Sequence, residues 1–448
     1  MTAPFIPPHP PRGTGPVPVW RGFVGERARN AVHGWSERAF TEPYIRRRVF
    51  GHNVHIPLTP DAVERVLLGN AANYVKPDLV KKLLKPTIGR GLLSSDGQLW
   101  RDQRKIVAAN FAPAAIDALV PVFASAARRA MAGWTGSEDM AGQATQTTMR
   151  IIADALFAGD PRLTTQAAMD HITAALDGVS EARLQVLLGL PLMPWSIRGK
   201  RARNGQAYLR ETLTRVVRDR LPGGGPDDFL GGLIRALHGK FADEDALALA
   251  VDNAATFYLA GHETTANAIT WTLYLLSEQP ALQAGAAAEA ETALAAGEED
   301  PALLDRLPLL RRILEESMRV YPPVPRFDRQ AVADDELNGQ PVGAGDIVSI
   351  WPWLLHRHHA LWEEPDSFDP DRWRPEAKAV QHRFQYLPFG GGPRLCVGMR
   401  FATAEALTVL AHWLRAWSFA PTPGREVRAS GMVTLRPSGG LPLVLIRR

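Results

Sequence analysis

The segment FGGGPRLCVG, residues 389–398, contains the one cysteine of a 448-residue chain. A lone cysteine cannot form an intramolecular disulfide, and no zinc-type cluster of cysteine and histidine surrounds Cys396. The three glycines before it allow backbone dihedrals that other residues avoid, and a close approach to a flat ligand. The residues from Gly398 to Leu407 are strong helix formers with apolar positions three and four apart, which predicts a helix that starts just after the cysteine.

Cys396 is therefore expected in a turn that leads into a helix N-terminus, where backbone N–H groups and the helix dipole favour a thiolate. A thiolate shielded by Phe389 suits a haem iron whose trans ligand must promote cleavage of an O–O bond. A buried structural cysteine is the common alternative for a single cysteine in a long chain. The Gly-Gly-Gly-Pro-Arg context before Cys396 favours the iron ligand.

These ten residues resemble the haem-binding loop of the cytochrome P-450 superfamily, F-x-x-G-x-R-x-C-x-G. The motif is matched at Phe389, Gly392, Arg394, Cys396 and Gly398. The resemblance implies haem b (iron protoporphyrin IX) as the cofactor and Cys396 as the proximal iron ligand. It also implies that Arg394 pairs with a haem propionate and that Phe389 and Gly398 belong to the cofactor site.

Composition limits the function more than the fold. Hydrophobic residues make up 46% of the chain, and 51 Lys+Arg against 47 Asp+Glu give a net charge of +4. So small an excess is no nucleic-acid footprint, and we expect no nucleic-acid partner. The arginine-rich segment 198–220 and the acidic segments 289–305 and 363–371 are expected to be solvated faces.

The N-terminus carries no sign of a membrane or secretion signal. Residues 1–20 contain seven prolines and no long apolar run, so they are neither a signal peptide nor an anchor. No other segment reaches about 18 uninterrupted apolar residues, the length that a spanning helix needs. We expect a soluble protein of the cytoplasm with no membrane span.

The apolar pattern predicts a mainly α-helical chain with a small β region. Residues 1–20 are expected to form an extended proline-rich arm, and residues 21–448 a single domain of the cytochrome P-450 fold. The clearest helix is 243–277, which is apolar nearly all round and should run through the interior. The resemblance implies that haem lies between this helix and the one after Cys396. The other expected elements are helices within 63–134, interrupted at Lys85-Pro86 and Ser95-Asp96-Gly97, within 143–220 and over 301–320, strands over 322–349 with an Asn338-Gly339 hairpin turn, and strands over 418–446.

The segment LAGHETT, residues 259–265, lies in the middle of the long predicted helix. Glycine there costs about 1 kcal/mol relative to alanine, and a carboxylate in an apolar helix costs more without a partner. A glycine and a glutamate beside two threonine hydroxyls indicate a local opening in the helix. In this opening Gly261 would leave room for O₂, and Thr264 could hydrogen-bond to it. A kinked helix with Thr264 and Thr265 bonded back to carbonyl groups is an equal alternative for this segment alone.

The same segment matches the superfamily's acid–alcohol motif A-G-x-[DE]-T at Ala260, Gly261, Glu263 and Thr264. The resemblance implies that Thr264 holds the bound oxygen species and that Glu263 relays protons. His262 is expected to be a packing or solvent-side residue.

Glu316 and Arg319 stand three residues apart on one helix face, where they can pair. Tyr321 and two prolines follow, so the segment matches the superfamily's E-x-x-R-x-x-P-P. The resemblance implies a lock of Glu316 and Arg319 with Arg372, which supports the cysteine loop and is not catalytic.

Trp100 and Arg104 are one helical turn apart and could both reach a propionate edge, although an amphipathic surface helix is the alternative. The family's W-x-x-x-R favours haem contact. Arg329, ten residues before Gly339, is expected to be another propionate arginine by the resemblance, with Arg326 as its close competitor.

The matched motifs extend from Trp100 to Gly398 in the family's order. They imply a haem-thiolate monooxygenase of the soluble bacterial type, which inserts one oxygen atom from O₂ into a C–H or C=C bond of a hydrophobic small molecule. The loop 187–195 could touch a membrane surface, but a lid over the pocket is favoured. Four segments are expected near the substrate from their location in the chain, and they are mostly apolar, as a lipophilic substrate requires. These segments are 74–93, 187–195, 255–264 and 324–327.

The chain ends soon after Cys396, so we expect no fused reductase and electrons from a separate ferredoxin or flavodoxin with its reductase. Arg101, Lys105 and Arg400 are expected to form a positive docking patch for that carrier, with solvated charges as the alternative. Two other functions stay open. A peroxide-driven haem-thiolate oxidase would not need the proton relay of Glu263 and Thr264, and a non-catalytic haem-binding sensor would not need an oxygen-activating helix.

Overall fold

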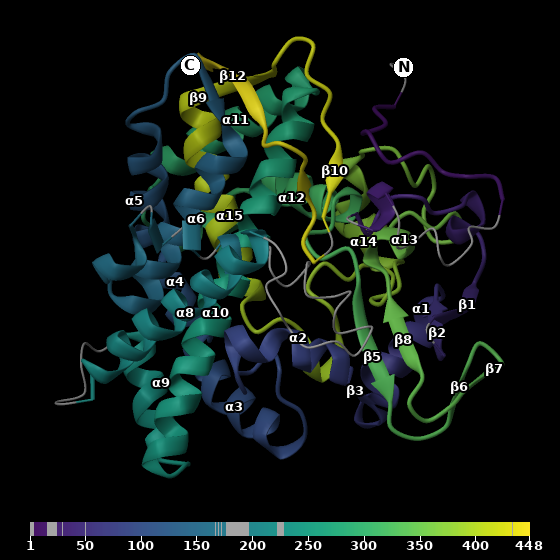
Figure 1. The fold of residues 1–448 in the computed structure, drawn as a ribbon. Coiled ribbons are helices and arrows are strands. Elements are labelled where there is room, and N and C mark those ends of the chain that lie inside the picture. Colours follow the sequence, from purple (N-terminus) through teal and green to yellow (C-terminus); the bar gives the residue numbers. More distant parts are fainter. Residues whose placement is uncertain are drawn as a thin grey trace. The chain divides into compact units, whose positions relative to one another are not determined.

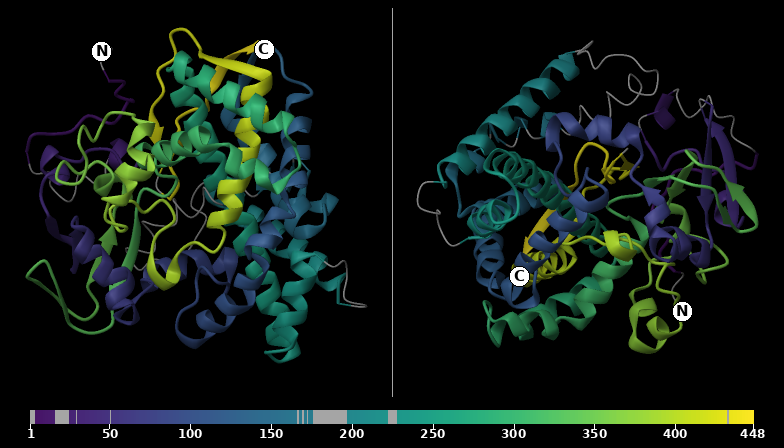
Figure 2. Two further views of the ribbon diagram at one scale, coloured as in Figure 1. Left: turned by 180° about the vertical axis from the view of Figure 1, so that it is seen from behind. Right: turned by 90° about the horizontal axis from the view of Figure 1, so that it is seen from below.

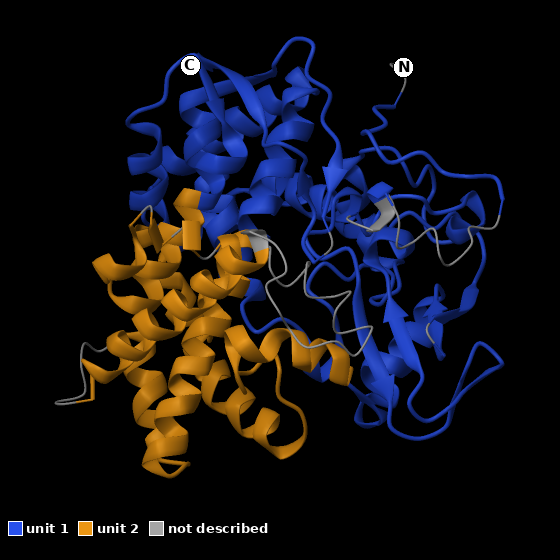
Figure 3. Cartoon of the chain, in the orientation of Figure 1, with its two compact units in different colours: residues 1–75, 123–145, 264–448 blue, residues 76–122, 146–263 orange. Residues whose placement is uncertain are grey.

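The structure is a computed structural model in which the chain divides into two compact units (Figure 3). Unit 1 consists of Met1–Val75, Phe123–Thr145 and Thr264–Arg448, and unit 2 of Lys76–Val122 and Gln146–Glu263. Helices predominate and the sheets are small, so the predicted fold class is confirmed. The described residues are 4–15, 25–28, 30–49, 51–165, 167–168, 170–171, 173–175, 197–221, 228–431 and 433–448.

Unit 2 is built from helices wherever the structure describes regular elements in it (Figure 1). Helix α9 (Phe229–His238) begins where the side chain of Asp228 accepts the N–H of Gly231 at 2.8 Å, which satisfies a donor that the helix leaves unpaired. Three aromatic rings, those of Phe111, Phe229 and Phe257, pack with centroids 5.2 to 6.0 Å apart. The other helices are α2 (Asp78–Ile88), α3 (Gly97–Asn110), α4 (Pro113–Asp117), α8 (Ile197–Arg218), most of α6 (Met140–Phe157) and the first part of α10 (Asp243–Ser277).

The helices of unit 1 pack around α15 (Met399–Ala416), which lies against α11 (Pro280–Ala295) and α12 (Pro308–Val320) (Figures 1 and 2). Nearly all of α15 is buried, as its apolar sequence requires. The ring of Phe401 meets that of Phe123 edge-on at 5.1 Å, and the indole of Trp413 donates to the carbonyl of Ala127 at 3.2 Å. Both partners lie on α5 (Val120–Met131). Short helices complete the unit: α1 (Pro60–Glu64), α13 (Pro352–Leu355) and α14 (Pro375–Ala379).

All strands of the described chain belong to unit 1. The largest sheet has the order β1-β2-β8-β5-β3, in which only β2 and β8 run parallel. The predicted hairpin joins β6 to β7, and its turn residues Asn338 and Gly339 have φ of +51° and +72°, as such a turn requires. The strands are β1 (Tyr44–Val49), β2 (His52–Pro57), β3 (Tyr74–Val75), β4 (Ser137–Asp139), β5 (Phe327–Ala331), β6 (Asp335–Leu337), β7 (Gln340–Val342), β8 (Ile347–Ile350), β9 (Trp417–Pro421), β10 (Ala429–Ser430), β11 (Arg436–Pro437) and β12 (Pro442–Arg447).

The long helix predicted over 243–277 is confirmed with those bounds. The helix predicted over 301–320 is instead a 3₁₀ segment, Pro301–Arg306, followed by α12, because Pro308 restricts the backbone of the residue before it. The break predicted at Lys85-Pro86 is wrong. Pro86 lies inside α2, and the helix ends only before Gly89, where φ is +51°. The loop 187–195 lies outside the described residues.

The charged segments are not solvated throughout, contrary to the prediction. Arg220 is buried, pairs with Asp228 at 3.2 Å and donates to the carbonyl of Phe157 at 2.8 Å. In the acidic segment 363–371, Asp366 pairs with two arginines. Burial with a specific partner cannot be read from the charge pattern alone.

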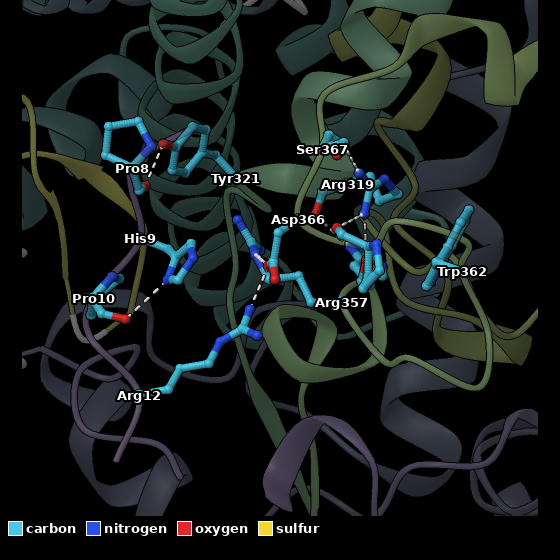
Figure 4. A network of polar contacts seen from close by, with 12 residues as sticks. Pro8, His9, Pro10, Arg12, Arg319, Tyr321, Arg357, Trp362, Asp366 and Ser367 are labelled. Carbon is cyan, nitrogen blue, oxygen red and sulfur yellow. Dashed lines mark hydrogen bonds and ion pairs between the residues drawn. The ribbon is translucent and has the colours of Figure 1, made fainter. Parts of the chain in front are cut away.

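The described residues of the N-terminal arm are extended and lie against other parts of unit 1 (Figure 4). The carbonyl of Pro8 accepts a hydrogen bond from the hydroxyl of Tyr321 at 2.6 Å. Arg12 pairs with Asp366, which also lies 3.6 Å from the guanidinium of the buried Arg357. Burial lowers the pKa of Arg357 to about 9. The carboxylate of Asp366 thus links the arm to a buried charge, while the domain boundary at residue 20 stays a prediction.

In the described part of the chain, no single helix has the length and apolar character to cross a membrane. One bent pair, Gly97–Asn110 with Pro113–Met131, meets the requirement by length and composition.

Candidate functional site

The cysteine loop leads directly into α15. Gly392–Arg394 form a 3₁₀ turn, Gly398 caps α15, and Cys396 lies between them with an exposed side chain. The N–H of Cys396 donates to the carbonyl of Phe389 at 3.0 Å, which closes the loop. The prediction of a turn before a helix N-terminus is confirmed, and this is a place where a thiolate is favoured.

Two glycines of the loop lie where a side chain would collide with other residues of the protein. Gly392 has φ of +64°, and a Cβ there would lie 1.7 Å from the carbonyl oxygen of Leu67. A Cβ on Gly391 would lie 2.8 Å from the ring of Phe384. Gly391 and Gly392 therefore let the loop approach other parts of unit 1. A Cβ on Gly390, where φ is +72°, would meet no described residue within 4 Å, and the close approach to a flat ligand stays a prediction.

Three arginines of unit 1 bear on the predicted propionate contacts. Arg394 is half-buried in the 3₁₀ turn of the loop, and Arg329 is half-buried on β5. The guanidinium of Arg329 donates to the carbonyl of Asp328 at 3.0 Å. Arg326, the competitor of Arg329, pairs with the carboxylate of Asp328 at 2.8 Å and lies 5.1 Å from the ring of Trp351. Arg326 is thus held by its own neighbours.

In unit 2, Trp100 and Arg104 lie one turn apart on α3, and both are half-buried. The residues of α3 that are fully buried are Gln103 and Val107, so α3 is amphipathic, and Trp100 and Arg104 flank its buried side. Trp100 and Arg104 thus lie on one helix at the spacing that was predicted, and the contact of their side chains with a cofactor stays a prediction.

The middle of α10 contains the acid–alcohol motif. Between residues 249 and 277 every residue is buried except Ala260, Gly261, Glu263 and Thr264. Ala260 is exposed and the other three are half-buried, and with 3.6 residues per turn all four lie on one side of the helix. The motif therefore marks the part of this stretch that a ligand can reach.

Two residues within the motif have packing contacts. A Cβ on Gly261 would lie 2.6 Å from the Cδ1 atom of Ile152, so the glycine makes room for that side chain, while its place beside O₂ stays a prediction. His262 is buried, its Nδ1 lies 2.8 Å from the carbonyl oxygen of Tyr258, and burial lowers its pKa. The carbonyl of His262 accepts the hydroxyl of Thr148 at 3.0 Å. The prediction of a packing histidine agrees with these contacts.

The predicted lock of Glu316, Arg319 and Arg372 is confirmed in unit 1. Glu316 and Arg319 are both fully buried on α12, and two pairs of their side-chain atoms lie 2.8 Å apart. The Nε atom of Arg372 lies 3.5 Å from Glu316, whose carboxylate also accepts the N–H of Asp369 and the indole of Trp373. Arg319 also donates to three carbonyl groups, at His356, Pro365 and Ser367. Figure 4 shows Arg319 beside Ser367.

This lock reaches the cysteine loop through His356. Burial and the nearby Arg319 lower the pKa of His356 to about 3, so its ring is neutral. Its Nε2 accepts the N–H of Leu387 at 2.8 Å, while its Nδ1 lies 3.3 Å from the carbonyl oxygen of Arg319. Leu387 precedes Phe389 by two residues, and the carbonyl of Phe389 holds Cys396. Support of the loop, which the resemblance implied, thus has a path of hydrogen bonds.

The sequence reading missed a polar track on α15. Glu405, Thr408 and His412 are fully buried on one side of the helix, at spacings of three and four. Burial raises the pKa of Glu405 well above its usual value, and the side chain of Thr265 acts against this rise. Burial lowers the pKa of His412 to about 4. The signal was available as a glutamate and a histidine inside an apolar helix.

Comparisons with known proteins cover nearly the whole chain. Residues 11–441 match the family model described as Cytochrome P450. Cyclooctatin synthase of Streptomyces melanosporofaciens is 32% identical over 401 residues, which cover 87% of this chain and 86% of that protein. The solved structure of the cytochrome P450DA heme domain matches with a TM-score of 0.81 at 24% identity, over 99% of this chain and 98% of that one. Retinoic acid bound cyanobacterial CYP120A1 matches with a TM-score of 0.79 at 22% identity, over 91% and 92%.

Proposed function

Because the chain belongs to the cytochrome P450 family of haem-thiolate monooxygenases, we propose that it inserts one oxygen atom from O₂ into a hydrophobic small molecule. Haem bound through a thiolate supplies the activation of O₂ and the cleavage of its O–O bond. The observation that carries the proposal is the position of Cys396, exposed at the N-terminal end of α15 in a loop fixed by Phe389 and Leu67.

The donor set fits this cofactor. Cys396 would hold the iron, and the N-terminal end of α15 favours its ionised form. Arg394 and Arg329 would pair with the propionates, joined by Trp100 and Arg104. Phe389 and Gly398 would shape the loop around the ligand.

Thr264 and Glu263 would hold and move the protons that the reaction consumes. Both are half-buried on the accessible side of α10, in a helix that is otherwise closed to solvent over this stretch. A hydroxyl can accept a proton from one neighbour while it donates to another, and a carboxylate can restore that proton. Ala260 and Gly261 add two small residues without polar side chains to this side, which supports a hydrophobic substrate.

Thr264→Ala is expected to separate electron use from product formation. The variant should bind haem and apolar ligands normally, because the Cβ atom and the helix are kept. The share of electrons recovered in product should fall at least about tenfold, because proton delivery is misdirected and hydrogen peroxide is released instead. The measurement compares the amounts of NADPH consumed, hydrogen peroxide released and product formed. The substrate is an apolar compound chosen because its binding shifts the spin state of the ferric haem.

Thr270→Ala is the matched control, since its hydroxyl is buried six residues further along α10 and donates back to the carbonyl of Ala266 at 2.7 Å. This control should couple electrons to product as the unmodified protein does. If Thr264→Ala is as well coupled as the control, Thr264 has no part in proton delivery.

We further propose that electrons come from a separate acidic carrier, a ferredoxin or a flavodoxin. Arg101 and Lys105 are exposed on α3, on the turn that also holds Trp100 and Arg104. Charges so placed attract an acidic partner over a distance, and salt shortens that distance from about 10 Å at 0.1 M to about 3 Å at 1 M.

Reversal of both charges, Arg101→Glu with Lys105→Glu, should slow the first electron transfer at low salt by about tenfold or more. The difference in transfer rate between the variant and the unmodified protein should vanish near 1 M salt. The affinity of the protein for an azole that binds the haem iron should not change. Arg215→Glu with Arg218→Glu, on an exposed part of α8, gives the same change in net charge as a control. Equal transfer rates for the two double variants at low ionic strength would place the docking surface elsewhere.

A further inference from the structure

Tyr44, His55 and Asp346 form a line of two hydrogen bonds in the largest sheet (Figure 1). On β1, Tyr44 is paired with Pro57, so His55 on β2 is its diagonal neighbour, within reach of an aromatic side chain. The hydroxyl oxygen of Tyr44 lies 2.5 Å from the Nδ1 atom of His55. The Nε2 atom of the same ring lies 2.9 Å from the carboxylate of Asp346, which directly precedes β8.

The surroundings fix the direction of both hydrogen bonds. Asp346 also accepts the N–H of Gly343 at 2.9 Å and the side-chain amide of Asn53 at 3.0 Å. Burial acts to raise the pKa of Asp346, but the hydrogen bonds that it accepts lower this pKa below its usual value. An ionised carboxylate only accepts, so the neutral ring of His55 carries its hydrogen on Nε2 and presents a lone pair on Nδ1. Tyr44 therefore donates to His55.

This arrangement is suited to the coupled loss of an electron and a proton. Burial raises the pKa of Tyr44 to about 12, so the phenol is neutral near pH 7. Removal of an electron from a neutral phenol makes its O–H strongly acidic, so oxidation is much easier where a base can take the proton. His55 is fully buried and can take it on Nδ1 without a change of position. Asp346 would then stabilise the imidazolium that forms.

Four other tyrosines bond to poorer bases. Tyr74 donates to Asp335 at 2.7 Å, but Arg65 pairs with the same carboxylate. Burial acts to raise the pKa of Asp335, and the hydrogen bonds from Arg65 and Tyr74 outweigh it and lower this pKa well below its usual value, so the carboxylate takes up a proton poorly. Main-chain carbonyl groups are weaker bases still, and the tyrosines whose hydroxyls donate to them are Tyr258, Tyr321 and Tyr386.

Oxidising equivalents have two routes to Tyr44. From outside, the phenol is half-buried, and the exposed Arg46 on the same face of β1 acts on it with a charge that attracts anions. From inside, β1 lies three strands from β5, a separation of about 14 Å. Trp351 directly follows β8, and its ring lies 4.7 Å from that of Trp35, which in turn lies 5.1 Å from the guanidinium of Arg47 on β1. Oxidisable rings thus extend from the middle of the sheet toward β1.

We propose that Tyr44 is a redox-active tyrosine, which gives one electron to an oxidant and its hydroxyl proton to His55. The products are a neutral phenoxyl radical, an imidazolium paired with Asp346, and the oxidant reduced by one electron. A small reductant such as ascorbate returns the electron, and the proton goes back from Nδ1 to the phenoxyl oxygen. The tyrosine would remove one-electron oxidants that oxygen activation releases when no product forms, and this use alone rests on the proposed function.

Four variants separate the contributions. Tyr44→Phe removes the O–H group. His55→Gln keeps an acceptor for Tyr44 and a donor for Asp346 but cannot take up a proton. Asp346→Asn weakens the base while it keeps the shape, and serves if His55→Gln does not fold. Tyr208→Phe is the matched control, because Tyr208 is also a half-buried tyrosine beside a histidine, but its ring is stacked on that of His171 at 4.4 Å.

The first measurement is electron paramagnetic resonance of the full chain, mixed with the anionic one-electron oxidant hexachloroiridate(IV) and rapidly frozen. The unmodified protein should give the narrow signal of a phenoxyl radical, which changes shape when the tyrosine rings are deuterated. Tyr44→Phe should lose this signal, and Tyr208→Phe should keep it. The rate of radical formation should fall at least about a hundredfold in His55→Gln, because the base that accepts the proton is lost. It should fall about tenfold in Asp346→Asn, because the carboxylate raises the basicity of the ring.

A phenoxyl signal that survives in Tyr44→Phe contradicts the proposal, as do equal rates in the unmodified protein, His55→Gln and Asp346→Asn. The oxidant is supplied from outside, so this result does not depend on the proposed haem chemistry.

The protective use is tested separately, with reductant and O₂ but no substrate. Methionine sulfoxide, measured by mass spectrometry, should accumulate at least about threefold faster in Tyr44→Phe than in Tyr208→Phe, because the oxidants then reach other side chains. Equal accumulation in the two variants would overturn the protective use.

Discussion

Cys396→His is expected to abolish the strongly red-shifted Soret band that reduced haem-thiolate protein shows with carbon monoxide. A histidine can still bind iron, so haem should be retained and the band should move to the position typical of histidine-ligated haem. Oxygenation should fall at least about a hundredfold, because a neutral imidazole donates less electron density than a thiolate. Absorption spectra of the reduced, carbon monoxide-treated variant are the measurement.

Met399→Leu is the control for this substitution. Met399 begins α15 three residues after Cys396 and is exposed, so its sulfur can be removed without disturbing the loop. The control should keep the red-shifted band. Because the chain has one cysteine, a band that survives in Cys396→His would show that the band does not arise from thiolate ligation by this chain, and would remove the basis of the proposed function.

Glu316→Gln is expected to destabilise unit 1 strongly. The substitution leaves the charge of Arg319 buried without its carboxylate, and breaking a buried pair by removing one partner costs about 3 to 5 kcal/mol. The contacts with Asp369 and Trp373 weaken as well, since a neutral amide is the poorer acceptor. The urea midpoint, followed by tryptophan fluorescence, should fall, and haem should be lost at lower urea because the lock supports the cysteine loop.

The neighbouring residue supplies the control. Glu315 pairs with Lys378 at 2.8 Å, and the lysine side chain is 51% exposed, so Glu315→Gln should cost no more than about 1 kcal/mol. Similar midpoints for the two variants would show that the buried lock contributes no more than a surface pair.

Much of the fold and of the site could be predicted because the relevant signals are local. The helix 243–277 is apolar over its whole length, and the turn at Asn338 and Gly339 depends on two residues that accept positive φ. The segment around Cys396 likewise combines glycines, a helix start and a thiol within ten residues. Such features need no knowledge of what packs against them.

The features that were missed depend on partners distant in sequence. Pro86 lies inside α2 although its missing N–H removes one hydrogen bond of the helix, so the helix is maintained there by contacts that the local pattern does not specify. Asp252 looks like one polar residue among many until Arg90 and Arg210 are seen beside it. The burial of Glu405 follows from the packing of α15 on its neighbours, which no local pattern specifies.

The discontinuous make-up of unit 1 also sets the order of events during protein synthesis. The carbonyl of Phe5 bonds to the N–H of Phe368, and the side chain of Asn30 to the carbonyl of Ala429. β4 finds its partner only in β12, near residue 443. Early segments must therefore wait on the ribosome for partners made several hundred residues later, and until then their apolar surfaces are exposed to other chains. A ribosome that pauses late in the message would thus hold a chain whose unit 1 is still open. The risk of aggregation therefore lasts until the last strand has been made.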